Sequence, residues 1–169
     1  MKKLVFALFF ATASLMTANA QVKLEIPPQT VDLKTKEDFV KYESVVVNAA
    51  KWLELTPLNK QKEQRKELGI FTFTWVVNNP ALDVQLNERL SQIYGKNDEL
   101  LIIYLANYAK DLIENRETAT KFTATKAALT SIMNVYKKGV RITKTIEMDE
   151  LIKLTKDNKL DEFVNNHFL

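Results

Sequence analysis

The stretch TPLNKQKEQRKELGIFTFTWVVNNP, residues 56–80, decides the fold class of this chain. Its first half is polar and its second half holds the densest cluster of large apolar side chains after the N-terminus. The near-alternation over residues 70–76 is typical of a half-buried strand. Pro57 directly after Thr56 is instead typical of a helix start, and residues 60–68 contain no strand former. We therefore predict a helix.

Such a helix is apolar on two neighbouring faces. One face holds Leu68, Phe71 and Trp75, and the other holds Ile70, Phe73 and Val77. A helix that is apolar nearly all round must lie between other helices. We therefore expect the stretch to be enclosed by its neighbours and to end before Pro80, because the residue before a proline disfavours the α conformation.

The first twenty residues, 1–20, have the pattern of a cleaved signal peptide. Lys2 and Lys3 precede an apolar run over residues 4–16, and Ala18-Asn19-Ala20 matches the small-x-small cleavage pattern. The run is shorter than the roughly 20 apolar residues that a membrane span needs. We expect bacterial Sec-type export to the periplasm or beyond the cell, and a mature soluble chain without stable membrane insertion.

The composition excludes several kinds of chemistry. The chain has 24 Lys and Arg against 21 Asp and Glu, so removal of Lys2 and Lys3 leaves the mature protein nearly neutral. A nucleic-acid partner is therefore not expected, because such proteins carry a strong basic excess. The absence of cysteine excludes disulfides, thiol chemistry and cysteine metal sites. The remaining length suits one ordinary hydrophobic core, and thus one domain.

The mature chain has the pattern of an all-α domain of five to seven helices at residues 35–169, preceded by an extended arm at residues 21–34. Alternation over residues 22–26 is compatible with a short edge strand and with a flexible terminus. Thr35 and Asp38 have the spacing of a capping box, which predicts the start of the first helix.

Helix-ending glycines, an apolar run and a capping threonine predict where the later helices lie. We expect a short helix that Gly95 ends, a densely apolar helix over residues 98–112, and a helix that Thr118 caps and Gly139 ends. Two small helices follow Thr145. The short connections predict helix hairpins, packed either as a single-domain bundle or as stacked hairpins.

The sequence offers few candidate catalytic residues. The single histidine, His167, lies two residues before the chain end, and three glycines are too few for a phosphate-binding loop. The composition still permits paired carboxylates, such as Glu63 with Glu67 or Asp98 with Glu99. Because acid pairs of this kind occur on most helical surfaces, we expect no enzyme and no cofactor or metal.

Two groups of residues are candidates for a binding surface. The basic set is Lys137, Lys138, Arg141 and Lys144, and the aromatic set is Trp52, Trp75, Tyr104 and Tyr108. The basic set can attract an anionic partner such as a membrane surface or an acidic glycan, or it can complement a helix C-terminus. The aromatic set can line a groove for a sugar or a peptide, or it can pack in the core.

A resemblance rests on three groups of residues. They are Ala49-Ala50-Lys51-Trp52-Leu53 before Thr56-Pro57, Trp75 with Asn79-Pro80, and Asn97-Asp98-Glu99-Leu100-Leu101. From Phe39 to the C-terminus the chain resembles a family of small exported helical proteins of Bacteroidetes-type bacteria, a family without a known activity. The resemblance implies an all-helical fold and a location beyond the inner membrane, and it carries no catalytic or ligand residues.

We interpret the chain as an exported, non-catalytic interaction module with a protein partner in the cell envelope. An exposed apolar or aromatic patch of more than a few hundred Å² is expected for that role. One alternative is a carrier of an apolar or glycan ligand between helix hairpins, which needs an enclosed apolar cavity of several hundred Å³. Another is a carboxylate-dependent hydrolase, which needs two buried carboxylates in one cleft.

Overall fold

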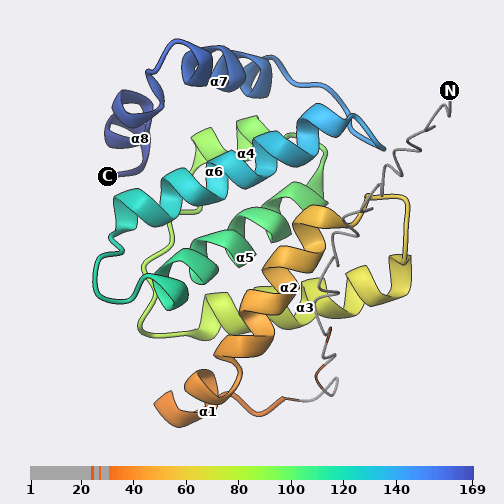
Figure 1. Ribbon diagram of the computed structural model, residues 1–169, viewed down its shortest axis with the longest axis vertical. Coiled ribbons are helices and arrows are strands. Elements are labelled where there is room, and N and C mark those ends of the chain that lie inside the picture. The colour runs from red at the N-terminus through yellow and green to blue at the C-terminus, as the bar shows by residue number, and fades with distance from the viewer. Residues whose placement is uncertain (1–23, 25–26, 28–30) are drawn as a thin grey trace, which may run out of the picture.

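The computed structural model describes residues 24, 27 and 31–169, and every regular element in this part of the chain is a helix (Figure 1). The elements are α1 (Lys36–Lys41), α2 (Glu43–Leu55), α3 (Lys62–Asn78), α4 (Glu88–Tyr94), α5 (Asp98–Glu114), α6 (Lys121–Lys138), α7 (Ile146–Lys156) and α8 (Leu160–Phe168). The all-α prediction is confirmed. The predicted signal peptide at residues 1–20 lies outside the described residues. No helix in the described part is both long and apolar enough to cross a membrane.

The predicted capping box at the first helix is confirmed. The Asp38 amide donates to Thr35 Oγ1 at 3.3 Å, and the Thr35 amide donates to Asp38 Oδ2 at 2.8 Å. The helix is split at Tyr42, whose ψ of 4° separates α1 from α2 and whose ring meets Phe71 edge-on at 5.7 Å. Neither glycine nor proline marks this split, which gives one helix more than the upper limit expected.

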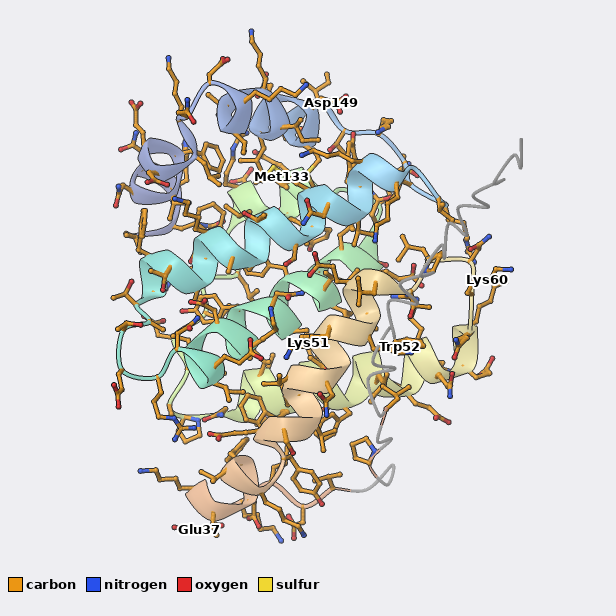
Figure 2. The ribbon with its side chains drawn as sticks, viewed as in Figure 1. Glu37, Lys51, Trp52, Lys60, Met133 and Asp149 are labelled. Carbon is orange, nitrogen blue, oxygen red and sulfur yellow. The ribbon has the colours of Figure 1, made fainter. Side chains whose placement is uncertain are left out.

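The bundle is built around α5. It packs against α2, α3, α4 and α6, and its buried residues are Leu100, Ile103, Tyr104, Leu105, Ala106, Asn107, Tyr108 and Ala109. On the far side of α6, α8 packs against α6 and α7 packs against α4, whereas α1 lies at the opposite end of the molecule (Figure 1). Met133 of α6 faces α7, where the Thr155 hydroxyl lies 3.4 Å from its Sδ (Figure 2). The most enclosed helix is therefore α5.

The described residues of the predicted arm lie against this bundle. Pro27 is buried, and Leu24, Val31 and Leu33 pack against the core. These residues are neither helical nor part of a strand. Apart from Leu24, the segment for which an edge strand and a flexible terminus were both considered, residues 22–26, lies outside the described residues.

Two predicted helix ends are confirmed, and so are the two small helices expected after Thr145. Gly95 ends α4 and Gly139 ends α6, and both have positive φ, at 56° and 70°. Thr145 caps α7, because the Met148 amide donates to its hydroxyl at 3.2 Å. These ends depend on hydrogen bonds and backbone angles within a few residues, which makes them readable from the sequence.

The predicted cap at Thr118 is wrong, because Thr120 caps α6. The Thr120 hydroxyl accepts from the Thr123 amide at 3.2 Å, and the Thr123 hydroxyl accepts from the Thr120 amide at 2.9 Å. Thr118 instead lies in the preceding turn, where its amide donates to the Asn115 carbonyl at 2.8 Å. Both threonines have suitable chemistry, and the backbone turn decides between them.

The predicted start of the central helix at Pro57 is also wrong. Residues 57–61 form a turn, in which the Lys60 amide donates to the Pro57 carbonyl at 2.9 Å, and α3 begins at Lys62. Leu58 within this turn is only 2% exposed. Burial of this side chain stabilises the turn in place of a first helical turn. Gln61 then enters the helix from the left-handed region, with φ of 49°.

The helix predicted over the central stretch is confirmed, but its predicted enclosure is wrong for one face. The buried face includes Leu68, Phe71, Trp75 and Val76. On the other face, Ile70 is 58% exposed, Phe73 is 40% exposed and Val77 is 48% exposed. The reason is position, because α3 lies at the edge of the bundle and packs mainly against α5 and α2. Within the part of the chain that the structure describes, one apolar face of α3 thus stays exposed.

Candidate functional site

An open groove of about 470 Å³ lies between α3 and α5, beside the exposed face of α3. We call it the α3–α5 groove. Its apolar lining is Leu53, Gly69, Ile70, Phe73, Leu101 and Ile102, and its polar and charged lining is Thr74, Lys62, Arg65, Lys66, Asp98 and Glu99. The groove therefore combines an apolar surface with charged groups contributed by both helices.

Gly69 is a point of close approach between the two helices. A Cβ atom at Gly69 would lie 3.6 Å from Cγ2 of Ile102, which is ordinary van der Waals contact. Gly69 itself is buried, so its missing side chain lets α3 and α5 pack closely beside the groove.

The exposed surface of α3 changes character along the helix. Lys62, Lys66 and Ile70 follow one another at intervals of four residues, so they form one row on the helix. Phe73 and Val77 form the neighbouring row, which begins at Gly69. Together, these two rows are cationic at the start of α3 and apolar towards its end.

Arg65 lies at the bottom of the groove and is 4% exposed. Its Nη1 donates to the Leu53 carbonyl at 3.2 Å and its Nη2 donates to the Thr56 carbonyl, which satisfies two groups at the C-terminus of α2. The guanidinium also lies 5.5 Å from the ring centroid of Trp52, on the side of α2 that faces α3 (Figure 2). Burial lowers the pKa of Arg65, and the charge of Glu99 opposes that shift.

The other charged groups of the groove form no salt bridge within the described part of the chain. Among the described residues, none of Lys62, Lys66, Asp98 and Glu99 has an opposite charge within 4.0 Å. Lysines border the groove on the α3 side, whereas carboxylates border it on the α5 side. The charged end of the groove is thus positive on one wall and negative on the other.

The structure does not bring the predicted aromatic set to one surface. Trp75, Tyr104 and Tyr108 are at most 1% exposed, and only Trp52 reaches the surface. The rings of Tyr104 and Tyr108 stack with centroids 6.4 Å apart. The Tyr108 hydroxyl donates to the Asp83 carbonyl at 2.7 Å, so it bridges α5 to the connection before α4. Three of the four aromatic residues therefore pack in the core.

The predicted basic set, Lys137, Lys138, Arg141 and Lys144, is exposed at the end of α6 and in the following turn. Two of these cations interact with their own fold. Lys138 Nζ donates to the Glu54 carbonyl at 2.8 Å, and Lys144 Nζ lies 3.9 Å from the ring centroid of Tyr136. Cations at a helix C-terminus also favour the helix dipole. An anionic partner for the set stays a prediction.

The carboxylate pairs do not form a buried site. Glu63 and Asp98 are exposed, and no Asp or Glu in the described residues is buried. Since the hydrolase alternative needs two buried carboxylates, its structural condition is not met in this part of the chain. His167 is exposed, and residues 31–169 with Leu24 and Pro27 contain no cluster of three His, Asp or Glu placed to hold a metal ion.

Most residues of the α3–α5 groove were not nominated from the sequence. The available signal was the second apolar face of α3, including Ile70 and Phe73, which pattern alone assigned to the interior. Gly69, Leu101 and Ile102 gave no signal, because a helical glycine and two aliphatic residues are equally typical of a core. Their role depends on which helices lie beside them.

Neither protein-family models, nor curated proteins, nor solved structures gave a match to this chain. The resemblance to small exported helical proteins therefore stays a prediction.

Proposed function

We propose that the protein is an exported, non-catalytic interaction module that binds another protein of the cell envelope through the α3–α5 groove. The observation that carries this proposal is the exposed apolar face of α3, where Ile70, Phe73 and Val77 are 40–58% exposed. Single exposed apolar residues are normal on protein surfaces, but a group of them on one helix beside a groove is typical of a binding site.

The energy of burial supports a binding role for this face. Complete burial of an aliphatic or phenyl side chain contributes about 1.5–3 kcal/mol of stabilising free energy. Ile70 and Phe73 are only partly buried in the folded chain, so only part of this free energy stabilises the fold. A partner that covers both can recover the remainder. Placement of apolar side chains in a groove between two helices is a recurrent mode of peptide recognition.

The shape of the groove favours a macromolecule over a carried ligand. A small ligand is usually held in a pocket that covers 70–90% of its surface, by general experience with such sites. The α3–α5 groove is open along the surface, so a small apolar ligand would remain largely in contact with water. A protein segment can cover the groove and also extend over Val77 beyond it.

Export is the second part of the proposal, and it is supported by the pattern of residues 1–20. When the full chain is expressed in a Gram-negative host, we expect it in the periplasmic or extracellular fraction with an intact mass that starts at Gln21. Ala20→Arg should block cleavage, because the processing site requires a small residue there. Recovery of the chain only in the cytoplasm with its first residues intact would contradict this part.

Site-specific photo-crosslinking tests the binding part. A photoreactive phenylalanine analogue at Phe73 should trap a discrete protein partner in living cells. The same analogue at Ile146 is the matched control, because Ile146 is 73% exposed and lies on α7, across the bundle from α3 (Figure 1). Identical products from both positions, or none from Phe73, would argue against the groove as a binding site.

A further inference from the structure

We infer that the α3–α5 groove binds an amphipathic helix whose two flanks carry opposite charges, acidic toward Lys62 and Lys66 and basic toward Asp98 and Glu99. This inference rests on the proposed function and names the chemistry of the partner. It is carried by the apolar lining of the groove and by the charges on its two walls, which have no ion partner among the described residues.

A helix fits the groove better than an extended segment. Most of the exposed surface that lines the groove is apolar, so it offers few groups that can pair with the backbone amides and carbonyls of an extended chain. Burial of unpaired backbone groups is costly, whereas a helix satisfies them internally. The apolar side chains of that helix can pack between Ile70 and Phe73 of α3 and Leu101 of α5, which line the groove.

The charges of the groove specify the flanks of the bound helix. Lys62 and Lys66 project from α3 on one wall, and Asp98 and Glu99 project from α5 on the other. A helix with two acidic flanks would place like charges against the α5 wall, and one with two basic flanks would do so against the α3 wall. Mixed flanks place opposite charges at both walls.

Three synthetic peptides test the inference. Each has about 18 residues, long enough to form a helix, and the same leucine row, with flanks that are all Glu, all Lys, or Glu on one side and Lys on the other. They are titrated into the isotope-labelled mature chain, residues 21–169, and followed by amide chemical shifts. The mixed peptide should shift the amide signals of Gly69, Ile70 and Ile102. It should bind about tenfold tighter than either uniform peptide, because each uniform peptide meets two like charges on one wall and each partly exposed ion pair changes affinity by up to about fivefold.

Charge reversal in the protein should change the order of the peptides. In Lys62→Glu/Lys66→Glu both walls become acidic, so the all-Lys peptide should become the tightest ligand of the three. The matched control is Lys153→Glu/Lys156→Glu, which makes the same change in net charge on exposed residues of α7. The control should keep the original order, and circular dichroism should show that both variants are folded.

Each possible outcome has a defined meaning. Equal affinity of the three peptides at the groove would overturn the charged-flank inference and leave the proposed function intact. Shifts confined to other helices, or no binding by any peptide, would overturn the assignment of a helix to the groove. If the amide signals of Gly69 and Ile102 change with protein concentration in the absence of peptide, a second copy of this chain occupies the groove, and the inference is wrong.

Discussion

The indole of Trp75 holds the backbone of Phe39 in place across the edge of the bundle. Trp75 Nε1 donates to the Phe39 carbonyl at 3.1 Å, and the two rings meet edge-on with centroids 6.0 Å apart. Both side chains are at least nine-tenths buried. This contact attaches the short helix α1 to α3, whose opposite face is exposed at the groove.

Substitution Trp75→Phe should therefore release α1 before the rest of the fold. The change removes the donor to the Phe39 carbonyl and leaves a cavity, with an expected loss of about 2–4 kcal/mol in the free energy of unfolding. Limited trypsin digestion under native conditions should cut faster at Lys36 and Lys41, within α1. Equal acceleration at Lys153 on α7 would indicate general unfolding and contradict the local attachment.

Two glycine substitutions should have opposite effects. Gly69→Ala should raise the free energy of unfolding by about 0.5–1 kcal/mol, since alanine favours a helix and its Cβ would be in ordinary contact with Ile102. Gly95→Ala should lower it by about 1–3 kcal/mol, because φ is 56° and the Cβ would lie 2.6 Å from Cγ2 of Thr145. Urea unfolding monitored by circular dichroism measures both. A stabilised Gly95→Ala variant would show that the α4 end is wrongly described.

Arg65 should stabilise the fold through the two hydrogen bonds that its guanidinium donates to the carbonyls of Leu53 and Thr56. Arg65→Met leaves the carbonyls of Leu53 and Thr56 without these bonds, and we expect a loss of about 3 kcal/mol in unfolding free energy. Arg65→Lys should recover little of this, because an ammonium cannot reproduce the planar geometry. The control Lys62→Met, on an exposed residue one turn earlier, should stay within about 0.5 kcal/mol of the parent. Full rescue by lysine would show that charge alone suffices.

Stability should fall in alkaline solution. Burial, with a smaller effect of Asp83, raises the pKa of Tyr108 to about 12, and burial also raises the pKa of Tyr104, whereas an unfolded tyrosine titrates near 10. Above about pH 10 the unfolded chain therefore binds fewer protons than the folded chain. The free energy of unfolding should decrease with rising pH by about 1.4 kcal/mol per pH unit for each such tyrosine.

Urea unfolding between about pH 9 and 12 measures this slope, and tyrosinate absorbance reports ionisation in the folded protein. Tyr108→Phe should reduce the slope by the contribution of one tyrosine, while it also costs about 1 kcal/mol at neutral pH through loss of the bond to the Asp83 carbonyl. Complete tyrosinate formation near pH 10 in the folded parent would contradict the burial of Tyr104 and Tyr108.

The groove shows where sequence reasoning reaches its limit. The second apolar face of α3 was visible in the sequence through Ile70 and Phe73, but the same pattern fits a core position and an exposed binding face. Leu101 and Ile102 looked like part of a buried helix. The groove exists because Gly69 lets α3 approach α5 while no other described helix covers the outer face of α3. No local feature of the sequence encodes that arrangement.

The sequence by itself determined the helical class and those helix ends whose stabilising groups lie within four residues. The Thr35–Asp38 box and the left-handed Gly139 depend on such local hydrogen bonds and backbone angles. Only the tertiary structure decided that Tyr104 is buried and Ile70 exposed, because burial depends on side chains contributed by segments far away in the sequence.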